Sequence, residues 1–463
     1  MEKGDAYDFH KMMEPQRDLE KGDWESLKKF FQEHNEALLE PFDLSRNTVI
    51  HRVAALNKPK ILRDFLGMLS PRDQWHALRR KNVDGNTVLH NGELSVEIAK
   101  IVLGYEKLPQ PSEDEIYPEQ HPEKELPLLE IRNAKGETPI YRAAFNGNLG
   151  LLKYLANQVV DLKKHCHRTQ DKFSILHASV SALYLDVALW LLKVDSSLAN
   201  EKDDNECTSL QLLSTMPFVF RSSMPFGTIS KLIYNFLPEF PYNVDDNDDD
   251  NIMVDDNDHD NIMVRVFTAC ASNRPYHISE WDVIKSIFVL KMMNTSAVVL
   301  ADVLVQNDHS WLRSFDYIQR PTRITTSVFS TYNVSSEPKR DEQCTLSDSD
   351  YPPLLLAAAK GIVEIVERIL ELYPDSINHV SKDELNILHV AVIYRQKKIF
   401  RIVKKHAACK SLINRLASNG NSVLHQVGSM KFYKGKHEAG VAYQLQEELR
   451  WCRVRNRQNF QAC

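Results

Sequence analysis

The chain is poor in glycine and lacks the short motifs on which common catalytic sites are built. Only 15 of its 463 residues are glycine. A G-x-x-x-x-G-K-[ST] phosphate loop, a G-x-S-x-G nucleophile elbow and an H-E-x-x-H zinc motif are all missing from the sequence. We therefore expect a protein that is not an enzyme and that needs neither a cofactor nor a small-molecule substrate.

Cysteine is sparse and irregularly placed. The seven cysteines are scattered, odd in number and never spaced as C-x-x-C, which is typical of free thiols in a reducing compartment. Cys166 lies between His165 and His167, but two ligand types on adjacent residues do not make a metal site without a second half at zinc-like spacing. We interpret this segment as a polar loop and expect no metal.

Long apolar runs are also missing. A membrane helix needs about 18 to 20 apolar residues, and the nearest candidate, Val283–Val305, is interrupted by Lys285, Lys291 and Asp302. The first ten residues are charged and do not form a signal peptide. We expect a cytoplasmic protein with no transmembrane segment, and keep a peripheral position at the plasma membrane as the alternative.

Aspartate is concentrated in one short segment. The net charge is −6, and nine aspartates lie between Asp245 and Asp260, so the remainder carries 57 basic and 54 acidic residues. A nearly neutral body has no basic field for nucleic acid. We therefore expect no nucleic-acid partner.

The aspartates belong to a duplicated decapeptide over residues 245–264, which invites comparison with a calcium-binding loop. Oxygen ligands fall at positions 1, 3 and 5 of such a loop, namely at Asp245, Asn247 and Asp249. However, Asp250 stands where glycine is required and Asp256 where a bidentate glutamate is expected. We favour an acidic loop, and keep a cation-responsive switch as an alternative function.

What the chain does contain is a recurring phrase of the form Gly-x-Thr-x-Leu-His. Its copies lie 34 to 51 residues apart, except for one central gap of 144 residues. Histidines one repeat apart cannot converge on one site, so we assign each to the turn between repeats, where it bonds backbone groups. These structural repeat-turn residues are Thr48, His51, Thr87, His90, Thr138, His177, His389 and His425.

Small residues and then an amphipathic run follow each phrase. After Ala357–Ala359 and Gly361, apolar residues recur from Ile362 to Leu370 at the spacing of one helical face. The threonine or serine that opens the phrase suits a helix N-cap, because its oxygen can accept a free backbone N–H. Each unit is therefore predicted to be a helix, a tight turn and a second helix.

The position of the repeats divides the chain. We predict a first array over residues 14–214 with an acidic, proline-rich loop at 106–130, and a divergent insert over 215–345 that ends in a Ser/Thr/Pro linker. A second array covers 346–430 and a helical tail 431–463. Helices are predicted outside the clear repeats at Trp24–Phe31, Ile229–Leu237 and Trp281–Val305.

The phrase Gly136–Ala144 resembles the ankyrin consensus. More widely, several segments resemble the plant accelerated-cell-death family of ankyrin proteins with a C-terminal Pro-Gly-Gly membrane domain. They are Gly22–Glu25 with Arg46–His51, Pro353–Val366, and Gly420–His425 with Tyr443–Leu449. The resemblance implies an all-α ankyrin-repeat solenoid in two blocks, separated by a divergent, partly disordered insert. It also implies a role in stress or defence signalling near a membrane, although we find no counterpart of the membrane domain in this chain.

From these observations we expect a non-catalytic scaffold that binds other proteins through a concave surface of turn tips and first helices. Membrane-anchored relatives are one class of expected partner, and a soluble decoy or subunit for them is the alternative function. Exposed contact residues are expected near the tips, at Arg46, Lys81, Asp84, Lys135 and Glu137.

Overall fold

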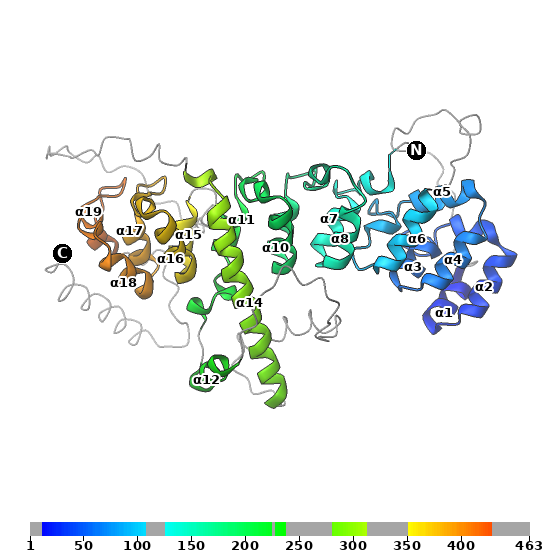
Figure 1. Cartoon of the computed structure of the whole chain (residues 1–463), viewed down its shortest axis with the longest axis horizontal. Helices are drawn as coiled ribbons and strands as arrows, with labels where there is room; N and C mark the ends of the chain where they lie inside the picture. The colour runs from blue at the N-terminus through cyan, green and yellow to red at the C-terminus, as the bar shows by residue number, and fades with distance from the viewer. Residues whose placement is uncertain (1–11, 108–125, 225–226, 238–279, 313–350, 428–463) are drawn as a thin grey trace, which may run out of the picture. The chain divides into compact units, whose positions relative to one another are not determined.

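The structure, a computed structural model, describes residues 12–107, 126–224, 227–237, 280–312 and 351–427. Within these ranges the fold is all-α, as the sequence predicts: α-helices alternate with 3-10 turns, and extended pairing is limited to three isolated bridges (Figure 1). The chain forms two compact units, Met1–Ala188 and Leu189–Cys463, and the division falls within α10 (Leu185–Val194).

The first unit is built from short helices that pack in pairs. Its α-helices are α1 Met13–Lys21, α2 Trp24–Glu33, α3 Val49–Ala55, α4 Pro59–Gly67, α5 Pro71–Arg79, α6 Val96–Glu106, α7 Pro139–Phe145, α8 Leu149–Ala156 and α9 Ile175–Ser181. Its 3-10 turns are η2 Asn35–Leu39, η3 Val88–His90, η6 Leu128–Glu130 and η7 Leu162–His165.

Two rows of helices run through this unit. One row contains the short helices that follow the repeated phrase, in which α7 contacts both η3 and α9. The other contains the longer helices, with α4 against α6 and α6 against α8. Each short helix also packs on its own longer partner, as α3 does on α4 and α7 on α8. The core therefore lies between the rows and continues from pair to pair, as in a repeat protein.

The phrase residues start three short helices of this unit in the same way. The hydroxyl oxygens of Thr48, Thr138 and Ser174 accept the backbone N–H three residues later, which satisfies a donor that has no partner inside the helix. Left-handed residues then make the tight turns, with Gly147 between α7 and α8 at a φ of 75°. Leu183 adopts a φ of 65° at the equivalent turn after α9, where a side chain is strained.

The second unit repeats this arrangement around one long helix. Its α-helices are α11 Ser209–Ser214, α12 Thr228–Phe236, α14 Glu280–Asn307, α15 Pro353–Lys360, α16 Val363–Leu372, α17 Ile387–Ile393, α18 Lys397–Lys405, α19 Cys409–Ile413 and α20 Val423–Val427. Its 3-10 turns are η8 Ser196–Asn200, η9 Pro217–Val219, η10 Arg221–Ser223 and η14 Pro374–Asn378.

In this unit the short helices α11, α15, α17 and α20 pack one on the next, although α11 and α15 belong to different predicted arrays. The side chain of Gln211 donates to the carbonyl of Tyr351 over 3.0 Å, across 140 residues of sequence. Helix α14 packs against both α11 and α16, so it is the longer partner of α11. The helix predicted at Ile229–Leu237 is present as α12, and it packs on α14 (Figure 1).

Helix α14 is the only one in the described ranges that is long and apolar enough to cross a membrane, over Ile284–Asn307, and half of an 18-residue apolar window in it is buried inside the protein. One such helix is weak support for a membrane span, because a core helix passes the same test. Its polar residues are engaged by neighbours: Lys291 donates to carbonyls of the α12 segment and Asp302 pairs with Arg368.

The predicted linker in 215–345, most of the loop at 106–130 and the tail at 431–463 lie outside the described residues.

Candidate interaction surface

The repeated histidines lie in the first turn of the short helices, each three residues after the N-cap and bonded to it, and not in the loops between repeats. The Nδ1 atom of His90 accepts the backbone N–H of Thr87 over 3.1 Å and lies 2.9 Å from the Thr87 hydroxyl oxygen. The same pairing joins His51 to Thr48 and His389 to Asn386. His177 contacts the hydroxyl of Ser174 at 2.6 Å.

At His90 the turn is also tied to the next repeat, because the Nε2 atom lies 3.1 Å from the carbonyl oxygen of Glu137. This geometry requires a neutral ring with its proton on Nε2, since Nδ1 must accept from a backbone N–H. Burial agrees with this protonation state: it lowers the pKa of His51, His90 and His389 to about 4 in each case.

These histidines make the stability of the fold depend on pH. An unfolded histidine has a pKa near 6.5, so between about pH 6.5 and 4 the unfolded chain binds more protons, and the free energy of unfolding falls as the pH falls. Each such histidine accounts for about 3 kcal/mol over that window. We expect urea denaturation of the wild type to show this loss between pH 7 and pH 4.

The variant His389→Gln isolates the effect from other titrating groups. Gln211 occupies the equivalent position in α11, and its side-chain oxygen accepts the backbone N–H of Thr208 over 3.0 Å. Glutamine therefore keeps the N-cap bond without titrating. We expect a shallower pH dependence for His389→Gln than for the wild type, and an unchanged slope would contradict the assignment.

The loop tips of the first unit are linked to one another by backbone hydrogen bonds. Val83 donates to the carbonyl of Ser45 and Ala134 to that of Asp84, each over 2.9 Å. Asparagine side chains join the same tips: Asn82 donates to Asn47 over 3.0 Å and Asn133 to Asn86 over 2.9 Å. A tip that is bonded to its neighbours loses little conformational entropy when a partner binds.

Most of the predicted contact residues lie on these tips. Arg46, Asp84 and Lys135 are exposed, and Lys81 is half-buried. The prediction for Glu137 is wrong, because its side chain is buried. Asn133 donates to this carboxylate over 2.8 Å, and two guanidinium groups neutralise it, those of Arg168 at 3.5 Å and Arg142 at 3.7 Å.

Two apolar residues on the tips were not predicted. Leu44 is 85% exposed and Val83 63% exposed, and they lie on tips joined by the bond between Val83 and Ser45. Apolar side chains held open among charged ones are typical of protein-binding surfaces. The sequence could have indicated Leu44 and Val83, because both lie just before a repeat phrase. A large apolar side chain at a loop tip has no core to pack into.

The remaining candidate sites do not form a metal centre in the part of the chain that the structure describes. His165 and Cys166 are buried at the end of η7, and the Cys166 thiol donates to the carbonyl of Leu162. No group of three or more potential ligands occurs among the described residues. The acidic decapeptides at 245–264 lie outside them.

The sequence matches no protein-family model and no curated protein.

Proposed function

We propose that this chain is a non-catalytic scaffold for protein–protein interaction, built as an ankyrin-repeat solenoid. The proposal rests on the linked loop tips of the first unit at residues 44–47, 82–86 and 133–135, which we call the tip row. The tip row presents Leu44 and Val83 beside the charges of Arg46, Asp84 and Lys135. The tip-to-tip hydrogen bonds hold these side chains in a fixed register, which is what recognition of a folded partner requires.

The ankyrin part of the proposal is supported by the repeated phrase together with the helix pairs that follow it. The contacts of α11 with α15 and of α14 with α16 favour direct stacking of the two predicted arrays within the second unit. The role in stress or defence signalling near a membrane rests on the family resemblance alone.

The test is affinity capture from plant extract with the intact chain, quantified by mass spectrometry. The variant Leu44→Asp/Val83→Asp places two carboxylates on the tips. Its matched control, Leu56→Asp/Val160→Asp, makes the same changes at exposed residues away from the tips. We expect the tip variant to lose the specifically captured proteins and the control to retain them.

Equal capture by both variants would reject the tip row as the binding surface. A second arm compares the intact chain with one that lacks residues 350–463. Recovery of membrane-domain relatives by the intact chain alone would favour the subunit or decoy role, and their absence from both would remove the membrane link.

A further inference from the structure

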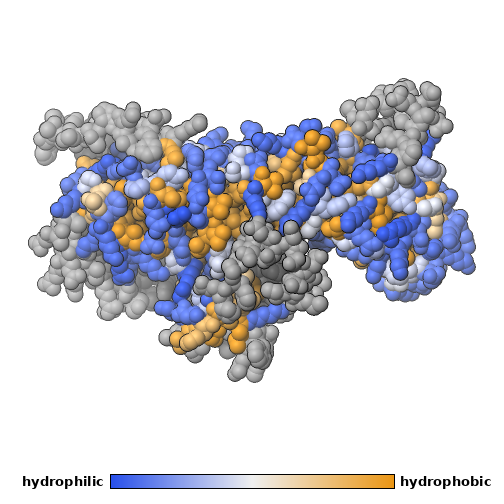
Figure 2. Space-filling model, viewed as in Figure 1, coloured by the Kyte–Doolittle hydropathy of each residue, from blue (hydrophilic) through white to orange (hydrophobic). Residues whose placement is uncertain are grey.

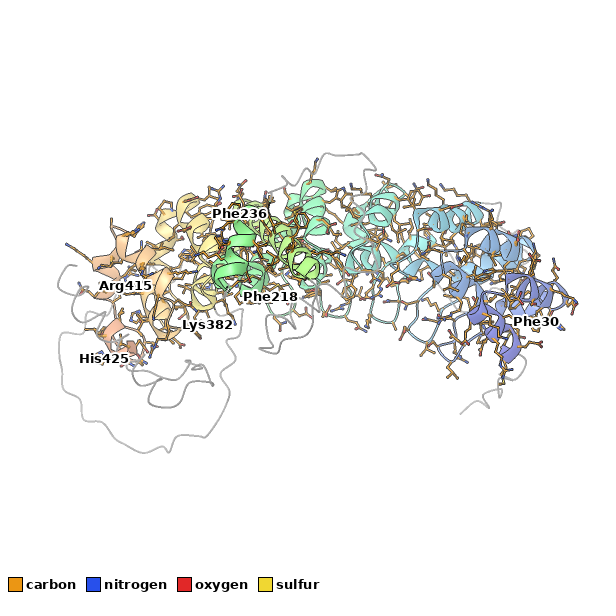
Figure 3. The ribbon with its side chains drawn as sticks, turned by 90° about the horizontal axis from the view of Figure 1, so that it is seen from below. Phe30, Phe218, Phe236, Lys382, Arg415 and His425 are labelled. Atoms are coloured by element: carbon orange, nitrogen blue, oxygen red, sulfur yellow. The ribbon has the colours of Figure 1, made fainter. Side chains whose placement is uncertain are left out.

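The last part of the described chain is strongly basic. Between Leu385 and Val427 there are eight lysines and arginines and no aspartate or glutamate. They are Arg395, Lys397, Lys398, Arg401, Lys404, Lys405, Lys410 and Arg415. The chain as a whole is acidic, so this concentration is a local feature of α18, α19 and their connections; Figure 3 marks Arg415 among these helices.

Helix α18 separates its apolar and basic residues cleanly. Ile399, Phe400 and Val403 are buried, on a helix that packs against α16, α17 and α19. Arg401 and Lys405 point to the exposed side, and Lys410 of α19 is exposed as well. None of these three basic residues forms an ion pair with any described residue.

Helix stability explains only part of this charge arrangement, because Lys404 and Lys405 in the last turn suit the macrodipole and the other basic residues do not. Arg401 lies four residues from both Lys397 and Lys405, and like charges at that spacing destabilise a helix. Lys397 and Lys398 also begin the helix, where the macrodipole favours acidic residues. The neighbouring longer helix α16 carries three glutamates and one arginine. A basic face kept at a cost to the helix indicates a ligand of opposite charge.

The surroundings of the basic face favour an acidic polypeptide over other anions. An amphipathic helix binds a bilayer by inserting its apolar face, and the apolar face of α18 is buried in the protein. Binding of single-stranded nucleic acid relies on exposed aromatic rings for stacking, and the one aromatic residue of α18, Phe400, is buried. Rows of basic side chains on a rigid element suit the recognition of acidic peptide motifs.

We infer that the exposed basic face of α18 and α19, centred on Arg401, Lys405 and Lys410, is a second docking site that binds an aspartate- or glutamate-rich polypeptide segment. It lies in the second unit, whereas the tip row belongs to the first. The inference therefore stands separately from the proposed function. The chain itself carries a segment of the required chemistry, with nine aspartates between Asp245 and Asp260.

The experiment measures fluorescence anisotropy of a labelled peptide with the sequence of residues 245–264. The protein is the full chain with those nine aspartates changed to asparagine, so that its own acidic residues do not compete. The test variant adds Arg401→Glu/Lys405→Glu. The matched control adds Lys29→Glu/Lys60→Glu. It changes the net charge by the same amount, at exposed residues of α2 and α4.

We expect the peptide to bind the parent and the control equally, to bind the test variant at least about 10-fold more weakly, and to dissociate as salt is added. Equal affinity for test variant and control would overturn the inference. So would binding of phosphatidylserine vesicles or of an oligonucleotide in the absence of peptide binding. Capture through the tip row is measured separately with Leu44→Asp/Val83→Asp, so failure of one proposal is distinguishable from failure of the other.

Discussion

Replacement of Gly85 by alanine is expected to lower the free energy of unfolding of the first unit by about 2 to 3 kcal/mol, the sum of left-handed strain and a lost hydrogen bond between two tips. Gly85 has a φ of +74°, and a Cβ atom added there would lie 2.6 Å from the backbone nitrogen of Ala134. That nitrogen donates to the carbonyl of Asp84. Because the obstacle is backbone, the two tips must move apart.

Gly22→Ala is the matched control for this prediction. Gly22 has nearly the same φ, +73°, but its added Cβ meets only the Trp24 indole nitrogen, at 3.9 Å. Its cost is therefore the left-handed strain alone, about 1 to 2 kcal/mol. Repeat proteins need not unfold in one step, so hydrogen exchange of residues 126–145 is the appropriate measurement. Equal protection in the two variants would show that the tip-to-tip bond does not stabilise the row.

Replacement of Lys291 by methionine is expected to release α12 from α14. The Lys291 side chain is 4% exposed, and its ammonium group donates to the carbonyls of Leu237 over 2.7 Å and Tyr234 over 3.2 Å. It also lies 5.3 Å from the centre of the Tyr234 ring. Methionine fills similar space but leaves both carbonyls at the end of α12 without this donor, at a cost of about 3 kcal/mol.

The measurement is hydrogen exchange over residues 228–237, with Lys285→Met as control because that lysine is exposed. We expect α12 to lose protection only in Lys291→Met, while α15 and α17 remain protected in both variants. Retained protection of α12 would mean that its apolar contacts with α14 are sufficient. Phe236 is 86% exposed on this helix, and Figure 2 shows apolar side chains gathered there. The apolar side chains of α12 are therefore only partly covered by α14.

The role of Gly85 can be predicted from the sequence, whereas that of Lys291 cannot. The turn at Gly85 belongs to the phrase that recurs along the chain, so its left-handed conformation follows from a glycine at a tip. The role of Lys291 could not be predicted in this way. In the sequence it only interrupts an apolar run, and its two carbonyl partners lie 57 and 54 residues away.

A repeat that carries the full phrase does not always form a full α-helix. Thr87 and His90 carry the full phrase, yet their helix is reduced to the 3-10 turn η3. The following Gly92 lies so close to the next repeat that a Cβ there would be 2.5 Å from the carbonyl oxygen of Arg142. The phrase fixes the cap, whereas the neighbouring repeat fixes how far the helix continues. Glu137 fails as a predicted contact for the same reason, since Arg142 and Arg168 enclose it.

By itself the amino-acid sequence determined the all-α class, the N-capped short helices and the bonding of the repeated histidines to backbone groups. These features depend on residues within a few positions of one another, and local hydrogen bonds and helical periodicity are sufficient to specify them. Only the tertiary structure decided that α14 is the partner of α11, that α11 packs on α15, and that the Glu137 side chain is buried. Those outcomes depend on contacts between different segments of the chain, up to 140 residues apart between Gln211 and Tyr351, and no local pattern encodes such contacts.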